Sequence, residues 1–457
     1  MGIGLGIGIN RSNYAQGIFN AYNARVVADG GITEAGNCVN AVTGLLLNAS
    51  LLIIPSGYKG GKAYAEIPTN GNADLTWTRA STALRTNSSG LLESMGSGVP
   101  RLSYMYGSCP ALLLEPQRTN LALYSEQFDN SAWVKLNTTV TSNSTTAPDG
   151  NSTADTLTET VITDFHQIGG QSLTNAPIAT YTLSVYVKLN SGTRNIGLLP
   201  INSAAAGNVK AVVFSSSGAF VGIVGSTGTD PTYTSTSLGN GWYRLTATAS
   251  STSIQTFAPA IRLFDGTAAA YLGSTSNSYY IWGAQIELGA YATTLIPTTT
   301  ASATRIADSF SRNNIYTNGL ITSSGGTWFV ELRGNVAYVR DSTAINLFLG
   351  DNITAPNNAF VIRTASSAST RLSLQKVVAG SFIILTTPST DTLKIAFKWN
   401  GTSADVFVNG VKEISATAFT TTNMEFLSCI AQNPTFIQQM ALFNSALTDA
   451  QCQTLTT

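Results

Sequence analysis

In YTLSVYVKL (181–189), apolar and polar residues alternate strongly, and a similar alternation recurs in GWYRLTATA (241–249) and YYIWGAQIEL (279–288). Alternation with a period of two is expected of a strand that buries one face. Runs of Ser, Thr, Gly and Asn, which favour turns, separate these stretches, and no helical pattern lies between them. The pattern predicts antiparallel sheets packed face to face as a β-sandwich.

Short strand-like runs resume in the last third of the chain. DVFVNGVKE (405–413) has the pattern of a hairpin, because Asn409 and Gly410 readily adopt the positive φ angles of a type I′ turn. The end of the chain, SALTDAQCQTLT (445–456), has a helical pattern instead, and Thr448 with Gln451 predicts a capping box at its start.

The N-terminal residues follow a different pattern. Gly alternates with Ile and Leu in MGIGLGIGIN (1–10), which favours an extended arm. YAQGIFNAYNARVVADGG (14–31) predicts a helix, since Ile18, Tyr22 and Val26 recur every four residues and a Gly pair follows. Such a short segment cannot bury its own apolar face, so we expect it to dock on a partner.

These patterns predict an all-β fold of tandem antiparallel β-sandwiches of jelly-roll types, with a short N-terminal arm and helix. Residues 292–308 are rich in Thr and Ala and are predicted to be an inter-domain linker. The predicted domains are an N-terminal anchor (1–50), a β-rich connector (51–118), a first β-sandwich (119–299) and a second β-sandwich (300–457).

The composition excludes several classes of function. Only 11% of the 457 residues are charged, the formal net charge is zero, and no basic stripe is present, so nucleic acid is not an expected partner. No stretch reaches the roughly 18–20 apolar residues that cross a bilayer. The N-terminus lacks the pattern of a signal peptide. We therefore expect no membrane insertion, and synthesis in a bacterial cytoplasm.

Four cysteines are present, Cys38, Cys109, Cys429 and Cys452, and none of them has CxxC spacing. In a reducing cytoplasm such residues are usually isolated thiols. The sequence thus favours free thiols over a disulfide framework.

Catalytic patterns are weak. The single histidine, His166, is predicted to lie at the surface or on an edge strand, and no GxSxG elbow accompanies it. The Ser-x-x-Lys string from Ser56 to Lys59 has no partner motif. A glycosidase needs only a pair of carboxylates, but no ExDxxE strand is present. The isolated acids are expected at turns or strand edges: Glu287, Asp405 and Glu425. We therefore predict no enzyme and no catalytic residues.

Ligand-binding residues can be narrowed only by residue type. A structural Ca²⁺ ion would take oxygen donors, for which Asp351, Asn352 and Asp405 are candidates without diagnostic spacing. Sugar binding needs exposed aromatic rings with polar neighbours. We expect Trp242 and Trp282, which lie within alternating strands, to be core residues. Three further aromatic residues are candidates for stacking on a sugar: Trp399, Tyr104 and Tyr106. No ligand residue is assigned.

A family resemblance lies in residues 75–137. The phrases TRAST (78–82), GVPR (98–101), LLLEPQRTNL (112–121) and YSEQFDNSAWVK (124–135) follow one another in that order. This stretch resembles a segment of fibre, collar and adhesin-type proteins of tailed bacteriophages. The resemblance implies a structural protein of the virion, a head, collar or tail fibre assembled in the host cytoplasm. It also implies other virion proteins and sister chains, commonly in a homotrimer, as partners.

Two further resemblances concern sugar binding. YVKLNSGTRNIGL (186–198) and GNGWYRLTATA (239–249) are similar to phrases of carbohydrate-binding modules. KIAFKWNGTSADVFVNGVKEI (394–414), followed by FIQQMALFNSALTDAQCQTL (436–455), resembles a concanavalin A-like lectin domain of the laminin-G type. These resemblances imply attachment to host surface glycans. A decoration protein that binds no glycan, a glycan depolymerase and a bacterial surface lectin remain alternatives.

Overall fold

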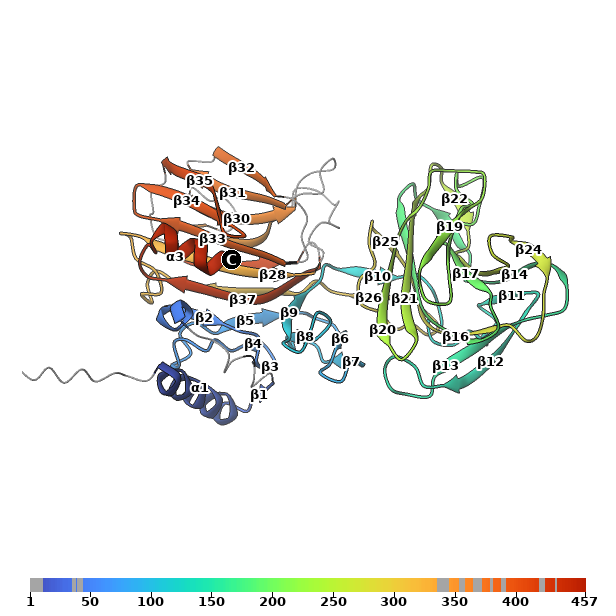
Figure 1. Ribbon diagram of the computed structural model, residues 1–457, viewed down its shortest axis with the longest axis horizontal. Helices are drawn as coiled ribbons and strands as arrows, with labels where there is room; N and C mark the ends of the chain where they lie inside the picture. Colours follow the sequence, from blue (N-terminus) through green and yellow to red (C-terminus); the bar gives the residue numbers. More distant parts are fainter. Residues whose placement is uncertain are drawn as a thin grey trace, which may run out of the picture. The chain divides into compact units, whose positions relative to one another are not determined.

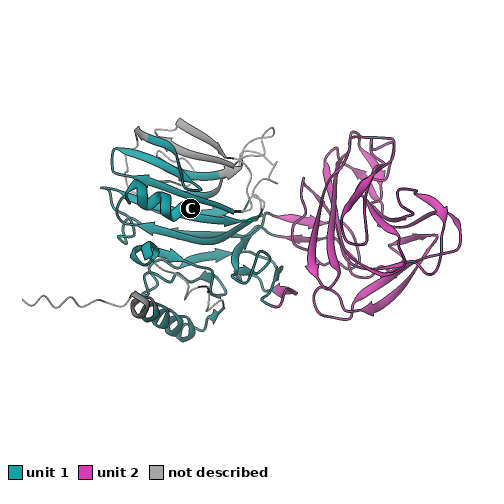
Figure 2. Cartoon of the chain, in the orientation of Figure 1, with its two compact units in different colours: residues 1–88, 95–116, 306–457 teal, residues 89–94, 117–305 magenta. Residues whose placement is uncertain are grey.

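The chain folds into two compact units, each of which is described by itself (Figure 2). Unit 1 consists of Met1–Ser88, Met95–Pro116 and Ile306–Thr457, and unit 2 consists of Ser89–Ser94 and Gln117–Arg305. The structure is a computed structural model, and the residues that it describes are 11–34, 38, 44–334, 345–352, 358–364, 372–378, 381–387, 392–418, 424–431 and 434–457.

The predicted all-β fold is confirmed. Antiparallel sheets make up most of both units (Figure 1). The named helices of the described residues are α1 (Arg11–Ala28), the 3₁₀ helix η1 (Gly44–Asn48) and α3 (Asp449–Thr456). In the described part of the chain, no helix is long and apolar enough to span a membrane.

Unit 2 is a sandwich of two antiparallel sheets. The first has the order β12 (Thr138–Thr145), β13 (Ala154–Glu159), β25 (Ser278–Leu288), β16 (Thr180–Ser191), β21 (Trp242–Ser250), β20 (Thr232–Gly239). The second has the order β11 (Val134–Leu136), β14 (Thr163–Gly169), β23 (Ala260–Phe264), β17 (Asn195–Leu199), β18 (Ala211–Phe214), β19 (Phe220–Val224), with β24 (Ala270–Leu272) beside β14. Two short pairs complete the unit: β10 (Arg118–Asn120) with β26 (Ala303–Arg305), and β15 (Leu173–Ala176) with β22 (Gln255–Phe257).

The three stretches with the strictest alternation form the centre of the first sheet. They are the adjacent strands β25, β16 and β21, and Tyr186 of β16 lies opposite Trp282 of β25. Their apolar residues meet those of the second sheet in one core. Leu183, for example, belongs to the same buried cluster as Leu198 and Ile261. The period-two pattern therefore predicts the central strands of this sandwich correctly.

Residues 292–308 do not form the predicted linker. Thr293 and Leu295 are buried, and the amide of Ile296 donates to Oε1 of Gln285 on β25 at 2.7 Å. Glu287 of the same strand, which is also fully buried, accepts hydrogen bonds from Thr293. The segment therefore covers the outer face of β25, and its Thr residues satisfy buried polar groups that a free linker would leave in water.

Unit 1 is a larger sandwich. Its first sheet has the order β1 (Ile32–Thr33), β3 (Gly57–Lys59), β4 (Lys62–Ala63), β5 (Leu75–Thr78), β27 (Ser309–Asn313), β36 (Phe426–Ile430), β29 (Ile345–Gly350), β30 (Asn358–Thr364), β31 (Leu372–Val378), β32 (Ser381–Thr387). Its second has the order β35 (Val411–Ala418), β34 (Ser403–Val408), β33 (Thr392–Trp399), β28 (Gly326–Arg333), β37 (Thr435–Phe443), β9 (Ala111–Leu114), β8 (Arg101–Ser103), with β2 (Leu51–Ile53) also beside β37. A short hairpin joins β6 (Ala83–Thr86) to β7 (Leu92–Met95).

These units differ from the four predicted domains. Strand β5 pairs with β27, and β9 pairs with β37, so residues 51–118 and 300–457 build one sandwich rather than a connector and a separate lectin-like domain. Their side chains share one core, in which Trp77 lies with Trp328 and Ile437. Local patterns identify strands but carry no information about which distant strand becomes the neighbour, and this is why the division was missed.

The helix α1 packs against its own chain. Tyr22 and Val26 pack against Tyr64, and the helix lies beside β1 and β3 (Figure 1). The guanidinium of Arg25 donates to both carboxylate oxygens of Asp74, at 2.7 and 3.0 Å. The predicted extended arm, residues 1–10, lies outside the described residues.

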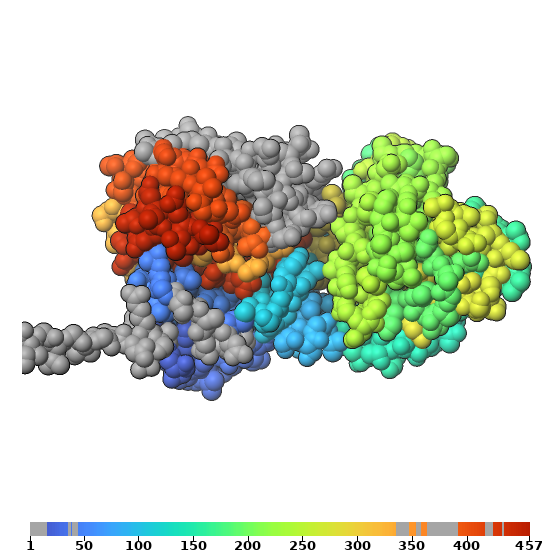
Figure 3. Space-filling view, in the orientation of Figure 1, coloured from blue at the N-terminus to red at the C-terminus, as the bar shows by residue number. Residues whose placement is uncertain are grey.

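Two local predictions are confirmed at the C-terminal end. Asn409 and Gly410 have φ angles of 45° and 83° at the turn between β34 and β35. Thr448 and Gln451 form the capping box of α3, which packs against β33 and β34. Cys452 and Thr456 of α3 are buried. Most of its other residues are exposed to solvent and form part of the surface of unit 1 (Figure 3).

A buried cluster of charges closes the sandwich of unit 1. Asp308 accepts hydrogen bonds from Arg79 at 2.8 Å, from the Arg101 guanidinium, and from the amide of Glu115 at 2.9 Å. Arg101 also donates to the Glu115 carboxylate at 2.7 Å. The side chains of Arg79, Arg101 and Asp308 are completely buried. A buried charge is tolerated only when paired in this way.

A second buried acid anchors the region under α1. Glu66 is fully buried, accepting hydrogen bonds from the Ile54 amide at 2.7 Å and from the Ser56 hydroxyl at 2.5 Å. The Tyr22 hydroxyl lies 2.9 Å from Oγ of Ser56 and so links the helix to this acid. Burial raises the pKa of Glu66 to about 8. Ser56 thus has a structural role here.

We predict that Asp308→Asn destabilises unit 1 by about 3–5 kcal/mol, because it leaves two buried arginines without their shared carboxylate. Urea unfolding measures the effect. The matched control is Asp230→Asn, which removes a mostly exposed carboxylate paired with Lys210 and is expected to change the free energy by less than about 0.5 kcal/mol. Equal effects of the two substitutions would contradict the structural role of the cluster.

We also predict that the stability of unit 1 falls as pH rises. The pKa of Glu66, about 8 in the fold, lies above the ordinary value of 4.5. Stabilisation by the protonated carboxyl is therefore complete below the ordinary pKa and is lost as pH rises through 8, with a slope of up to about 1.4 kcal/mol per pH unit. Urea unfolding at several pH values checks this. Glu66→Gln, which stays neutral, should flatten the slope, and an unchanged slope would refute the assignment.

Candidate functional site

A groove of about 420 Å³ opens in unit 1. It is lined by residues of the turn after β8, of β28 and β37, and of the segment before β3: Cys38, Leu46, Ile54, Tyr106, Gly107, Ser108, Cys109, Glu331, Arg333, Gln438 and Gln439. Its volume lies in the range of about 300–1,000 Å³ that is usual for small-molecule sites.

Strand geometry gathers polar side chains in this groove. Glu331 and Arg333 are two residues apart on β28 and therefore share a face, while Leu332 between them enters the core. Glu331 lies opposite Gln439, but Leu332 lies opposite Ile437, so Gln438 is the extra residue of a β-bulge. The bulge brings both glutamines to the same groove.

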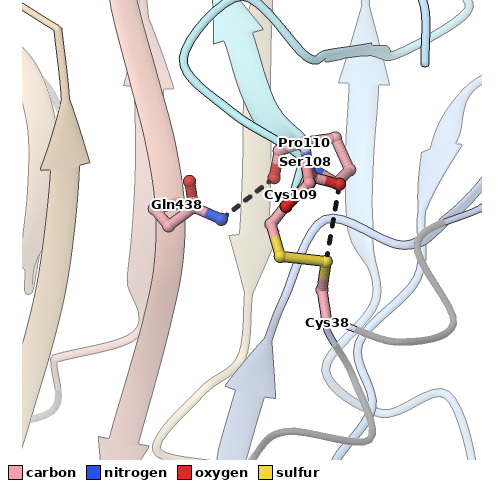
Figure 4. Close-up of a disulfide and its surroundings, with 5 residues drawn as sticks. All are labelled: Cys38, Ser108, Cys109, Pro110 and Gln438. Carbon is pink, nitrogen blue, oxygen red and sulfur yellow. Dashed lines mark hydrogen bonds between the residues drawn. A yellow bond between two sulfur atoms is a disulfide. The ribbon is translucent and has the colours of Figure 1, made fainter. Parts of the chain in front are cut away.

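The polar groups are held but not saturated. Nε2 of Gln439 donates to Oε2 of Glu331 at 2.6 Å, and Nη2 of Arg333 lies 2.9 Å from Oε1 of Glu331. Oε1 of Glu331 receives no hydrogen bond of good geometry. Nε2 of Gln438 donates to the Pro110 carbonyl at 3.2 Å (Figure 4). Amide and guanidinium groups therefore line the groove from fixed positions, and the buried Glu331 carboxylate holds Gln439 and Arg333 in place.

An exposed aromatic ring lies beside these groups. The Tyr106 ring is 45% exposed, and it packs edge-on against Phe436 with 4.7 Å between centroids. Its hydroxyl end lies 2.7 Å from where a Cβ of Gly334 would be, and Gly334 has a φ of 85°. Both constraints require glycine at that position. The Phe436 contact and the close approach to Gly334 thus position Tyr106 at the groove.

A disulfide fixes the turn that carries Tyr106. Cys38 and Cys109, 71 residues apart, are bonded, and Sγ of Cys38 lies 3.8 Å from the Ser108 carbonyl oxygen (Figure 4). The prediction of isolated thiols is therefore wrong for this pair, because two cysteines without a spacing motif give no signal of their proximity. The remaining thiols, Cys429 and Cys452, are buried, and burial raises the pKa of each.

The prediction that His166 lies at the surface or on an edge strand is wrong. Its side chain is fully buried on β14, which has neighbours on both sides. Nδ1 lies 2.8 Å from the Asn137 carbonyl oxygen, and Nε2 lies 3.3 Å from that of Tyr271. The ring therefore connects backbone segments and takes no part in the groove.

The aromatic predictions have mixed outcomes. Trp242 and Trp282 are buried, as predicted. Trp399 is fully buried in the core of unit 1, so its predicted exposure beside a turn is wrong. Tyr104 and Tyr106 follow β8 instead of lying within it, and of these two only Tyr106 lines the groove.

The acidic residues that the sequence suggested as ion ligands or as isolated acids do not lie together. Asp351 accepts from the amide of Asn358, Asp405 pairs with Lys398 and Lys412, and Glu425 accepts from the Thr317 hydroxyl. Asn352 follows Asp351 in the loop after β29. Within the described ranges, no three His, Cys, Asp or Glu side chains form a group that could hold a metal ion.

No family model matches the chain, and no curated protein matches it. Several solved structures show a remote likeness. Domain 4 of an arabinanase from Geobacillus stearothermophilus, in complex with arabinotriose, is 14% identical, covers 35% of this chain and 78% of its own, and has a TM-score of 0.27. The CBM40 of a Ruminococcus gnavus sialidase is 13% identical, covers 30% and 84%, and has a TM-score of 0.22. Mouse laminin α1 domains LG4-5 are 9% identical, cover 62% and 89%, and have a TM-score of 0.20. TM-scores this low establish no relationship.

Only Tyr106 of the groove residues was a sequence candidate. Glu331, Arg333, Gln438 and Gln439 were missed, because a polar residue on a strand is ordinarily a solvated one. The available signal was QQ at 438–439, two adjacent polar residues that interrupt the alternation of β37. Such an interruption is typical of a bulge.

We predict that breaking the disulfide with Cys109→Ser lowers the stability of unit 1 by about 2–4 kcal/mol, because the bond closes a long loop of the unfolded chain. Thermal unfolding with and without dithiothreitol measures this. The reductant should lower the melting temperature of the native protein and leave that of a Cys38→Ser, Cys109→Ser double variant unchanged. An equal response of both proteins would mean that the bond contributes nothing.

Proposed function

We propose that this protein is a non-catalytic carbohydrate-binding component of a bacteriophage particle, and that the groove of unit 1 holds a saccharide of the host surface. The observation that carries the proposal is the exposed Tyr106 ring beside the planar polar groups of Glu331, Arg333, Gln438 and Gln439.

The chemistry of the groove suits a sugar. A pyranose presents an apolar face, which packs on an aromatic ring, and hydroxyls at its edge, which need fixed donors and acceptors. Tyr106 supplies the ring. The two glutamine amides and the Arg333–Glu331 pair supply donors and acceptors whose orientation is set before binding, which reduces the entropy lost on binding.

The carboxylates argue for binding without hydrolysis. Glycoside cleavage usually needs two carboxyl groups about 5–10 Å apart across the bond. Of the described residues that line the groove, Glu331 is the only acid, and it is already engaged by Gln439 and Arg333. The groove therefore lacks a second carboxyl group for the usual mechanism.

The viral part of the proposal rests on the resemblance of residues 75–137 to phage fibre and collar proteins. In a fibre, commonly a homotrimer, several weak sites would act together through their effective concentration. The Cys38–Cys109 disulfide agrees with a location on the released virion, because virion surfaces are oxidising whereas the host cytoplasm is reducing. The bond would then form after assembly.

We predict that Tyr106→Ala weakens saccharide binding at least tenfold, because the stacking surface is lost. Binding of the labelled full chain to an array of immobilised saccharides, and to intact bacteria with or without periodate oxidation of their glycans, measures this. The matched control is Met105→Ala, which removes an exposed neighbour on the same turn that does not line the groove and should leave binding unchanged.

Two outcomes would overturn the proposal. A folded chain that binds no saccharide and no bacteria would leave a purely structural decoration protein. Release of new reducing ends from a bound glycan would instead show a depolymerase.

A further inference from the structure

Unit 2 contains a second cavity, of about 510 Å³. It lies beside the end of β20 and the start of β21, and its lining residues are Gly90, Leu91, Thr145, Thr146, Ala147, Pro148, Lys188, Leu238, Gly239, Asn240 and Trp242. It shares no residue with the groove of unit 1. Its volume also suits a small molecule.

The walls of this cavity are held in place. The Leu92 amide donates to the Pro148 carbonyl at 3.0 Å and attaches the tip of the β6–β7 hairpin to the loop after β12. On the opposite wall, Asn240 and its two flanking glycines all have positive φ angles, which gives a tight turn. The Lys188 side chain lies over Gly241, with Cε 3.5 Å from where a Cβ would be. Its position is thereby defined by packing.

Lys188 differs from the other lysines of unit 2. Lys135 donates to the carbonyl oxygens of Asp129 and Asn130, at 2.8 and 2.6 Å, and Lys210 pairs with Asp230 at 2.6 Å. Lys188, which is half-buried, has no such partner among the described residues. An ammonium ion that lines a cavity without a counter-charge can form charge-assisted hydrogen bonds with an anionic ligand.

The remaining lining residues are donors and apolar surfaces. None of the described lining residues is acidic, and Thr145 and Thr146 belong to the same lining as Lys188. The Trp242 indole N–H likewise has no acceptor in the described part of unit 2. One cation with an indole and hydroxyls matches a carboxylate carried on a sugar ring better than a phosphate, which is usually bound by several cationic or backbone donors.

We propose that this cavity binds an acidic saccharide, with the sugar carboxylate on Lys188 and the ring next to Trp242, whose largely buried side chain lines the cavity. The site is independent of the groove in unit 1. It would make the chain bivalent for glycans, with one groove that selects hydroxyls and one cavity that selects a negative charge.

The test titrates the full chain with sodium D-glucuronate and follows tryptophan fluorescence and protein NMR shifts. D-glucose and sodium phosphate serve as the neutral and the inorganic comparison. Saturable binding of glucuronate, at least tenfold tighter than that of either comparison, is expected. Lys188→Gln should weaken it at least tenfold, Lys188→Arg should largely retain it, and Trp242→Phe should remove the fluorescence change.

The matched control is Lys210→Gln, which removes a lysine outside the cavity and should leave glucuronate binding unchanged, as should Tyr106→Ala. This last variant separates the cavity from the groove, because failure of either site leaves the other measurable. Equal binding of phosphate, equal binding of glucose, or full binding by a folded Lys188→Gln protein would each overturn the assignment.

Discussion

The buried carboxylate of Asp308 is the contact on which unit 1 depends. The chain leaves this unit at Pro116 and returns at Ile306, so nearly two hundred residues of unit 2 interrupt it. Asp308, just after the return, accepts from Arg79 and Arg101 and from the amide of Glu115, just before the departure. Its own amide donates to the Glu115 carbonyl, and its carbonyl accepts from Ala431. The two ends of the interruption are therefore joined inside the core.

The groove follows from this junction. Because Glu115 is fixed, β9 lies beside the first half of β37, and the turn between β8 and β9 is placed over the bulge at Gln438. The disulfide to Cys38 then adds a second attachment within that turn, at Cys109. The turn that carries Tyr106 is thus held by charge pairing at the base of the β8–β9 hairpin and by a covalent bond in the turn itself, which leaves the Tyr106 ring exposed without leaving it loose.

Sequence patterns predicted what is local and missed what is distant. Alternation identified β16, β21 and β25, and turn chemistry identified the Asn409–Gly410 hairpin, since these depend on neighbouring residues. The pairing of β9 with β37 and the bond between Cys38 and Cys109 depend on residues far apart in the chain, for which one sequence contains no signal. Tyr106 could be named as an aromatic candidate, but its polar neighbours could not, because only the fold brings them together.

The scarcity of charge makes the remaining charges informative. With only 24 basic and 24 acidic side chains in 457 residues, the polar groups at the surface of this chain are mainly hydroxyls and amides. Several of its charges are instead buried in pairs, as in the cluster of Arg79, Arg101, Glu115 and Asp308, where Asp308 pairs with both arginines. In a chain with so few charges, a lysine that lines a cavity is an unusual group. The same holds for an arginine that is partly exposed while its acidic partner is buried. Arg333 and Lys188 are such residues: Arg333 lines the groove of unit 1, and Lys188 lines the cavity of unit 2.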